Sequence, residues 1–354
     1  LLDSTVRLAE ATIDAGRRAD GLFHSYDILK LDGAGAGAGA RVEHLGPMLE
    51  GQVAVLESGL LDDADAVELL RALRASGLYR ADQHSYLLYP DRPPVPFLER
   101  NTLAGAPPMT EPSIFVVDRE GKWHFHADLS TLANVEERLA AVDASPAVRE
   151  EVRALWRATF AHDAFTGRSD RFFMFEGLGS IYWHMVAKLA VAVQWCYGQA
   201  SDPAAAAALA QIYHDVRDGL GFRKDPALQG AFPTDPYSHT PGHMGAQQPG
   251  MTGQVKEQVL TRFGELGVEV VDGCVRFAPR LVPRDELLDA PGTAAFRDVD
   301  GGEVSIDLEA GSLAFSYCQV PVVYRLGDAP ALELEYADGR SEQIDGDGLE
   351  RLLA

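Results

Sequence analysis

One long segment with Asp235 as its single acidic residue carries the side chains best suited to binding a neutral polar ligand. Residues 234–253, TDPYSHTPGHMGAQQPGMTG, contain no Lys, Arg or Glu. A loop of this length in a compact domain is usually either disordered or functional, and this one lacks the charge and Ser repetition of a disordered tract. Because its side chains can donate to and accept from hydroxyl groups, we expect it to bind a sugar. The expected contacts are Tyr237, His239, His243, Gln247 and Gln248.

The same segment bears on metal and anion binding. His239 and His243 are four residues apart, a spacing that could chelate zinc on a helix. Pro241 lies between them and prevents that helix, and no HExxH motif occurs, so no metal is expected. Thr252, followed by Gly253, stands at the N-cap position of the next helix, where free backbone N–H groups favour an anion. A Thr cap without a ligand explains the residue equally well.

Glu176 is the carboxylate whose surroundings best suit proton transfer. In RFFMFEGLGSIYWHM it follows an aromatic wall and precedes the most apolar helix of the chain. Partial desolvation would raise the pKa of this carboxyl group toward the range that serves general acid–base catalysis. The structural alternative is a Glu that caps the helix N-terminus and interacts with its dipole, and the two roles are compatible.

Other polar side chains stand in similar Gly-flanked or aromatic settings. Glu50, in GPMLEGQVAV, and Gln52 two residues later are candidate substrate contacts. A buried structural ion pair of Glu50 with an Arg is the alternative. Two further loops, DGLFHSYD and DQHSYLLYP, add the side chains of Asp20, His24, Tyr26, Asp27, Gln83, His84, Tyr86 and Tyr89.

Composition restricts the partners and the compartment. The chain has 53 acidic and 31 basic residues, a formal net charge of −22, so neither nucleic acid nor a membrane is expected as a partner. Three widely spaced Cys without a CxxC motif are typical of a reducing compartment, and no apolar run approaches the roughly 18 residues that span a bilayer. We therefore expect a cytoplasmic protein. Because Leu1 stands in mid-helix, we also expect a piece of a longer polypeptide, in which case a missing leader says little.

Helical patterns dominate up to about residue 266, and a period of two follows. Asp62 and Asp63 occupy N-cap positions before an apolar stripe, and the segment 177–198 is apolar nearly all round, as in a buried inner helix. The long stretches 82–128 and 220–251 are interpreted as loops, and GAGAGAGA (33–40) as a flexible surface loop. The predicted helices are 1–18, 47–60, one starting at 62–63, 131–142, 146–162, 177–198, 203–219 and 252–266.

Alternating residues after Gly267 predict antiparallel strands. VEVVDGCVRF reads as a hairpin turning at Asp272-Gly273, and EVSIDL, SLAFSYC, VPVVYRL and ALELEY follow. Successive helix pairs joined by long loops on one side suggest an α/α toroid with the ligand on its loop face. We therefore predict a mainly α fold: residues 1–266 form an incomplete portion of an (α/α)6 toroid, and residues 267–354 form a small antiparallel β-sandwich.

Several motifs in a fixed order resemble a known family. They are DGLFHSYD, GPMLEGQVAVLESGLLDDADAVELLRAL, LLYP, FMFEGLGSIYWHM, PGMTG and LGVEVVDGCVRFAPRL. Together they cover most of residues 15–285 and resemble the C-terminal half of glycoside phosphorylases of the cellobiose, chitobiose and cyclic-glucan type, which are similar to glycoside hydrolase family 94. The resemblance implies an incomplete (α/α)6 barrel followed by a small β domain.

The resemblance also implies inverting cleavage of a glycosidic bond, with an Asp general acid that would precede Leu1. Phosphate would replace the activated water of inverting hydrolases, and Thr252-Gly253 matches the family's phosphate-binding Thr-Gly. A phosphate-binding His of the family falls at Gly177, beside Glu176. Because a carboxylate would repel phosphate but could activate water, we expect hydrolysis of a neutral, β-linked gluco-oligosaccharide with Glu176 as general base.

Three alternatives stay open: a phosphorylase that uses Thr252-Gly253, a non-catalytic glycan-binding or structural subunit, and a toroid lyase or cyclase that uses the His-rich loop. No cofactor is expected, and inorganic phosphate is a possible co-substrate. The expected partners are an oligosaccharide and a protein surface that covers residues 1–18, either the N-terminal remainder of the same polypeptide or a complementary chain.

Overall fold

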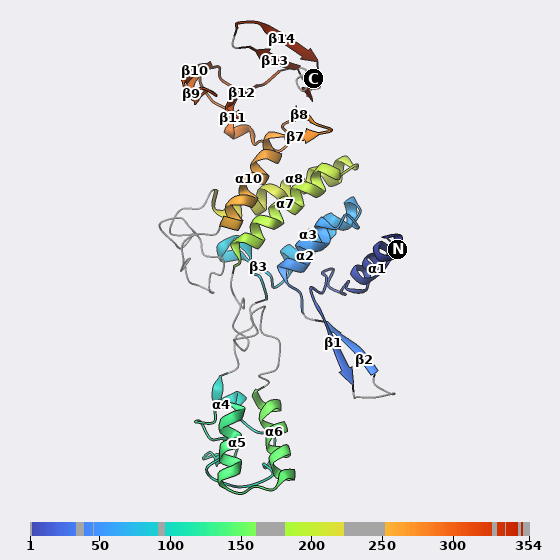
Figure 1. Ribbon diagram of the computed structural model, residues 1–354, viewed down its shortest axis with the longest axis vertical. Coiled ribbons are helices and arrows are strands. Elements are labelled where there is room, and N and C mark those ends of the chain that lie inside the picture. The colour runs from blue at the N-terminus through green and yellow to red at the C-terminus, as the bar shows by residue number, and fades with distance from the viewer. Residues whose placement is uncertain are drawn as a thin grey trace.

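The computed structural model describes most of the chain in nine stretches (Figure 1). They are residues 2–32, 39–44, 46–90, 96–160, 181–222, 252–327, 331–336, 338–345 and 348–349. Within them, a helical part is followed by antiparallel strands, which confirms the coarse fold prediction.

Two helical hairpins and one further helix form the main body. They are α2 (Leu49–Glu57) with α3 (Asp63–Ala75), α7 (Trp183–Gln199) with α8 (Pro203–Arg217), and α10 (Thr252–Leu266). The predicted cap is confirmed at α3, where the Asp62 carboxylate accepts a hydrogen bond of 2.8 Å from the backbone N–H of Asp65. Pro203 opens α8 at a position where its missing N–H costs nothing, directly after the capping residue Asp202.

The two hairpins are packed in the same orientation. The Asp63 carboxylate at the start of α3 accepts hydrogen bonds of 2.8 Å from the backbone N–H groups of Ser201 and Asp202, which precede α8. At the other ends of these helices, Arg74 and Asp215 form an ion pair of 2.7 Å. Helices α3 and α8 therefore run in the same direction along their contact.

Helices α2, α7 and α10 likewise share one direction. At the C-terminal end of α2, the Leu56 carbonyl accepts a hydrogen bond from Sγ of Cys196, near the end of α7. Nε2 of His184, in the first turn of α7, lies 3.5 Å from Oε1 of Glu257 in α10, and Gln194 further along α7 donates to the carbonyl of Thr261. The layers are thus α2, α7 and α10 against α3 and α8.

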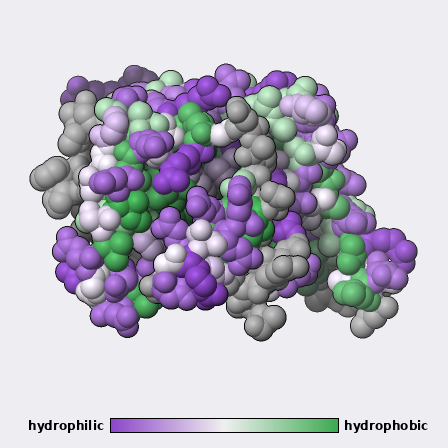
Figure 2. Space-filling view, turned by 90° about the horizontal axis from the view of Figure 1, so that it is seen from above, coloured by the Kyte–Doolittle hydropathy of each residue, from purple (hydrophilic) through white to green (hydrophobic). Residues whose placement is uncertain are grey.

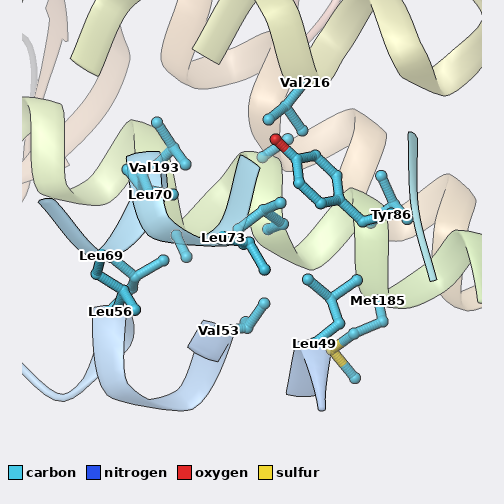
Figure 3. Close-up of a cluster of buried hydrophobic side chains, with 14 of the residues drawn as sticks. Leu49, Val53, Leu56, Leu69, Leu70, Leu73, Tyr86, Met185, Val193 and Val216 are labelled. Atoms are coloured by element: carbon cyan, nitrogen blue, oxygen red, sulfur yellow. The ribbon is translucent and has the colours of Figure 1, made fainter. Parts of the chain in front are cut away.

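The main core lies between these layers (Figure 3). Helix α7 contributes most to it: Trp183, Val186, Leu189, Ala192 and Val193 are at most 1% exposed. The predicted buried inner helix is therefore confirmed, although it begins at Trp183 within the described residues. Apolar side chains from α2, α3 and α8 complete the cluster, for example Leu49, Val53, Leu56, Leu69, Leu70, Leu73 and Val216.

A second core lies in residues 96–160, away from the first (Figure 1). Its elements are α4 (Phe97–Arg100), β5 (Phe115–Val117), β6 (Trp123–Phe125), α5 (Leu132–Ala141) and α6 (Pro146–Phe160). Phe115 and Phe125 pair across the strands, with ring centroids 4.8 Å apart, and pack with Trp156 and Phe160. The interpretation of 82–128 as loop was therefore wrong for these strands, whose three-residue length gives too few alternations to be recognised.

The N-terminal elements are more exposed. Helix α1 (Leu2–Ala15) has no buried residue, and its Leu2 and Leu8 are 77% and 68% exposed. Its predicted contact with another protein surface stays a prediction. Strands β1 (Asp27–Asp32) and β2 (Gly39–His44) form an antiparallel ribbon, and they enclose most of the Gly-Ala segment, of which 33–38 lie outside the described residues.

The C-terminal region is a series of antiparallel pairs (Figure 1). The pairs are β7 (Val268–Val271) with β8 (Cys274–Phe277) and β15 (Gly348–Leu349), β9 (Gly292–Arg297) with β10 (Glu303–Leu308), β11 (Ser312–Tyr317) with β12 (Val320–Arg325), and β13 (Ala331–Glu335) with β14 (Ser341–Asp345). Asp272 and Gly273 have φ of 51° and 79°, as a two-residue hairpin turn requires, so the predicted turn is confirmed.

The predicted strands are confirmed, but the described residues do not form a sandwich. Hydrogen bonds join the strands only within each pair, or within the three strands β7, β8 and β15. In the described part beyond Leu266, the buried apolar residues are Val268, Leu281 and Leu308. Figure 2 views the molecule from this end and shows apolar patches scattered over a largely hydrophilic face. Alternating side chains therefore form hairpins here without a shared inner layer. The division into domains at residue 266 stays a prediction, and no described helix could cross a membrane.

Candidate functional site

Most of the predicted site lies outside the described residues. This holds for the expected general base Glu176 and for the expected sugar contacts Tyr237, His239, His243, Gln247 and Gln248. Helix α10 begins at Thr252, followed by Gly253, as predicted for the helix 252–266, so Thr252 is its first helical residue and not the predicted N-cap. Their roles in binding phosphate stay predictions.

Gln52 has a structural role in place of the predicted substrate contact. Its side chain is fully buried, and Oε1 accepts a hydrogen bond of 2.9 Å from the backbone N–H of Phe23. Nε2 donates to the carbonyls of Phe23 and Met48, each at 2.9 Å. The amide thus joins the loop before β1 to the start of α2. Glu50 lies in the first turn of α2 and is half-buried.

The starts of α7 and α10 converge on a group of titratable side chains, here called the α7–α10 polar cluster. Its members are Tyr182, His184 and Glu257. The hydroxyl of Tyr182 lies 3.5 Å from Nδ1 of His184, whose Nε2 lies at the same distance from Glu257. Glu257 is only 5% exposed and also pairs with Lys256 at 3.3 Å. A carboxylate buried beside an imidazole can hold or pass a proton.

The cluster joins the two helices that follow the segments selected from the sequence. Helix α7 follows the segment that carries Glu176, and α10 follows the segment 234–251. The contact between His184 and Glu257 connects these two helices. Neither residue was predicted, since both occupy ordinary helical positions.

Electrostatics disfavour charge on Glu57, the last residue of α2, although the residue is among the exposed positions of that helix. Burial is the main cause that raises the pKa of the Glu57 carboxyl, and the nearby Glu257 carboxylate adds to it. The ammonium group of Lys188 acts in the opposite direction. Because folding favours the protonated form, the ionised carboxylate of Glu57 weakens the folded state above its raised pKa.

We predict that Glu57→Gln makes the protein slightly more stable than the wild type at pH 7, by less than about 1 kcal/mol because the residue is exposed. The folded-state pKa of Glu57 lies above its ordinary value of 4.5, so the wild type loses stability as pH rises between these two values. Gln does not titrate there, and the stability difference should therefore shrink on acidification below pH 4.5. Urea unfolding of both proteins at pH 4 and pH 7 measures it. A variant less stable than the wild type at pH 7 would contradict this account.

A second polar group lies where α3, α8 and the β3–β4 hairpin meet. Strands β3 (Tyr79–Arg80) and β4 (Ser85–Tyr86) are joined by the turn η1 (Ala81–Gln83). Nε2 of His84 lies 3.0 Å from the Asp215 carboxylate, and Nδ1 lies 3.4 Å from the hydroxyl of Tyr79. The guanidinium of Arg74 covers the Tyr79 ring at 3.6 Å. These contacts fix the hairpin to the end of α8.

Burial affects the ionisation of Tyr86, which lies on strand β4. It raises the pKa of Tyr86 to about 12, so this hydroxyl stays protonated and can donate a hydrogen bond at neutral pH. His84 itself has a positive φ of 47°, and a methyl group at Gly219 would overlap the His84 carbonyl. Gly219 belongs to the short helical turn η2 (Asp218–Phe222). This turn can approach the hairpin so closely only because residue 219 has no side chain.

Among the described residues, no group of three or more His, Cys, Asp or Glu side chains could hold a metal ion. Comparisons with models of known families and with curated proteins return no match for this chain. Nothing in them identifies a glycoside phosphorylase family, and the motif resemblance stays a prediction.

Proposed function

We propose that the chain is part of an inverting, carbohydrate-active enzyme that hydrolyses a neutral β-linked gluco-oligosaccharide. The proposal rests on the motif order of the sequence and on one structural observation. Helices α2, α7 and α10 share one direction, so the starts of α7 and α10 meet at the α7–α10 polar cluster. The segments with the expected general base and the expected sugar contacts adjoin these two helix starts.

The finer architecture in this proposal is part of an (α/α)6 toroid. Alternation of two layers along the chain supports it: α2, α7 and α10 run one way, and α3 and α8 pack outside them with a common direction. In such a ring, the helix starts of the inner layer and their preceding loops occupy one face. A ligand site on that face would draw on several loops at once.

In the proposed reaction, Glu176 takes a proton from water as the water attacks the anomeric carbon from the face opposite the leaving group. An inverting mechanism needs its two carboxyl groups roughly 6.5–9.5 Å apart, so that this water fits between base and sugar. The general acid that protonates the leaving oxygen is not assigned to a residue of this chain.

Phosphorolysis is the second candidate, and a specific observation favours it. Thr252 and Gly253 open α10, so the backbone N–H groups of a helix N-terminus are available to an anion at this position. Phosphate would then replace water as the attacking group, and no general base would be needed. In a third reading, a non-catalytic subunit would keep the sugar contacts without either reaction.

Product analysis distinguishes these readings. The complete gene product is incubated with β-linked gluco-oligosaccharides, with and without inorganic phosphate, and its products are separated by chromatography. We expect free sugar of inverted anomeric configuration, formed at the same rate in both reactions. Formation of a sugar 1-phosphate only when phosphate is present would favour the phosphorylase. Binding without any product would favour the non-catalytic subunit.

A further inference from the structure

We propose that His124, on strand β6, is a pH-sensitive link that holds the segment 101–103 to the β5–β6 hairpin of the second core. At neutral pH its imidazole ring carries hydrogen on both nitrogens, and loss of one of them at alkaline pH releases the segment. The inference goes beyond the proposed reaction and does not depend on it. It stands on the groups that surround this ring, none of which was selected from the sequence.

The two ring nitrogens of His124 each face an oxygen atom. Nδ1 lies 3.1 Å from the backbone carbonyl oxygen of Asn101, and Nε2 lies 3.0 Å from Oδ2 of Asp118. A carbonyl and a carboxylate can only accept, whereas a neutral imidazole has hydrogen on one nitrogen and a lone pair on the other. Only the imidazolium ion therefore donates to both oxygens at once.

The surroundings of Asp118 keep its carboxyl group ionised, so it cannot supply the missing hydrogen itself. The hydrogen bond from His124 is the largest cause that lowers the pKa of Asp118 below its ordinary value of 3.8, and the backbone N–H groups of Lys122 and Glu120 lower it further. These two N–H groups donate to Oδ1 at 2.8 and 2.9 Å. The other oxygen, Oδ2, is the one that faces the ring.

The neighbouring elements bring no second charge into contact with the ring in the part of the chain that the structure describes. Val116 is its partner across the hairpin, and Thr102 is its partner on the other side. Both are uncharged. The next charges along these elements are Arg119, beside Asp118 on the turn, and Arg100, the last residue of α4. Asp118 is therefore the counter-ion of the ring.

The ring joins two parts of the second core. Asn101 follows α4, and its side chain accepts a 2.9 Å hydrogen bond from the backbone N–H of Phe125 and donates one of 2.8 Å to the Phe125 carbonyl. The backbone N–H of Leu103 donates to the Trp123 carbonyl at 2.8 Å. Residues 101–103 thus run antiparallel beside β6, and His124 adds a side-chain bond to this contact.

Burial makes the second hydrogen of the ring important. The side chain of His124 is 11% exposed and Asn101 is 2% exposed, so water cannot freely replace a lost partner. Deprotonation would place a nitrogen lone pair against an oxygen lone pair, at a cost in free energy. Folding therefore favours the doubly protonated ring, and the link is lost as alkaline pH removes its proton. At the acidic end, the link is lost as pH falls through the lowered pKa of Asp118.

NMR of the complete protein, made with isotope-labelled histidine, reads the hydrogen on each ring nitrogen. At pH 7 we expect hydrogen on both nitrogens of His124. His214 is the internal control: burial lowers its pKa below 6.5, so it should be neutral. His124→Gln and His214→Gln assign the signals, and Asp118→Asn should return the His124 ring to the neutral form. A neutral His124 ring in the wild type at pH 7 would overturn the inference.

Hydrogen exchange tests the release of the segment. Protection factors of the amides of residues 101–103 and 123–125 should fall about tenfold between pH 7 and pH 9 in the wild type, the effect of one lost hydrogen bond. In His124→Gln, which does not titrate, they should stay constant over this range. Constant protection in the wild type, or an equal fall in His124→Gln, would contradict the link. If His124→Gln does not fold, Asp118→Asn supplies both the assignment and the comparison.

Discussion

Glu176→Gln is expected to abolish the release of free sugar by the complete gene product and to leave any formation of sugar 1-phosphate intact. Gln retains the shape and hydrogen bonds of Glu but cannot accept a proton. A positioned general base contributes about 10²–10⁴-fold to such a step, and we expect a loss of that size in kcat. Phosphate needs no general base because it is already a nucleophile at neutral pH.

Steady-state kinetics with and without phosphate measure this prediction. Glu309→Gln, on an exposed turn of the β region, makes the same chemical change away from the proposed site and should leave both rates unaltered. Full hydrolytic activity in the Glu176 variant would remove its assignment as the base. Equal losses of both reactions would indicate that Glu176 positions the sugar instead.

Glu265→Ala is expected to lower the free energy of unfolding by about 3–5 kcal/mol, the usual cost of removing one partner from a buried ion pair. The side chain of Glu265 is 2% exposed and ties three helical positions together. Its carboxylate lies 2.8 Å from Nε of Arg217 and 2.7 Å from Nη1 of Arg262, and it accepts a 2.6 Å hydrogen bond from Tyr213. The variant leaves the buried Arg217 and Tyr213 and the half-buried Arg262 without that acceptor.

The network also reaches the β region through Glu286 in the turn η3 (Arg284–Glu286). Burial alone would raise the pKa of Glu286, but hydrogen bonds from Arg217 and Arg262 hold it below its ordinary value. The ionised form is therefore favoured by folding. Loss of Glu265 should weaken both the contact of α8 with α10 and the contact of these helices with η3.

Urea unfolding measures the effect, and an exposed ion pair supplies the control. Glu120 pairs with Lys122 at 2.7 Å, but its side chain is 72% exposed. Glu120→Ala should therefore change the free energy of unfolding by at most about 1 kcal/mol. Similar small changes in both variants would contradict a stabilising role for the buried network.

Local features of the fold could be predicted because local chemistry determines them. Asp62 caps α3, Asp272-Gly273 turns the first β hairpin, and the apolar helix from Trp183 is buried. Packing between hairpins is a property of distant residues, and the alternating strands alone could not distinguish a sandwich from separate pairs. Trp195 shows the same limit: it belongs to the segment 177–198 that is predicted to be buried, yet it is 41% exposed beside Gly59.

The site was harder to predict because the useful contacts join residues far apart in the chain. His184 and Glu257 are separated by 73 positions, and no local motif pairs them. Gln52 resembled a ligand contact by its polarity, although its amide serves the backbone of Phe23. The one sequence feature that indicated the structural role of Gln52 was its position in an apolar run. A polar side chain in such a run is commonly buried and hydrogen-bonded within the protein.

Helix α10 buries polar side chains and exposes apolar ones, the reverse of an ordinary surface helix. Its inward positions Glu257, Thr261 and Glu265 are at most 7% exposed, whereas Val255 and Val259 are 54% and 48% exposed. Little hydrophobic gain therefore attracts this helix to α7 and α8 before Arg217 of α8, which pairs with Glu265, is in place. Assembly of the molecule should consequently proceed in order, with a formed α8 serving as the template on which α10, and the strands that follow it, come to rest.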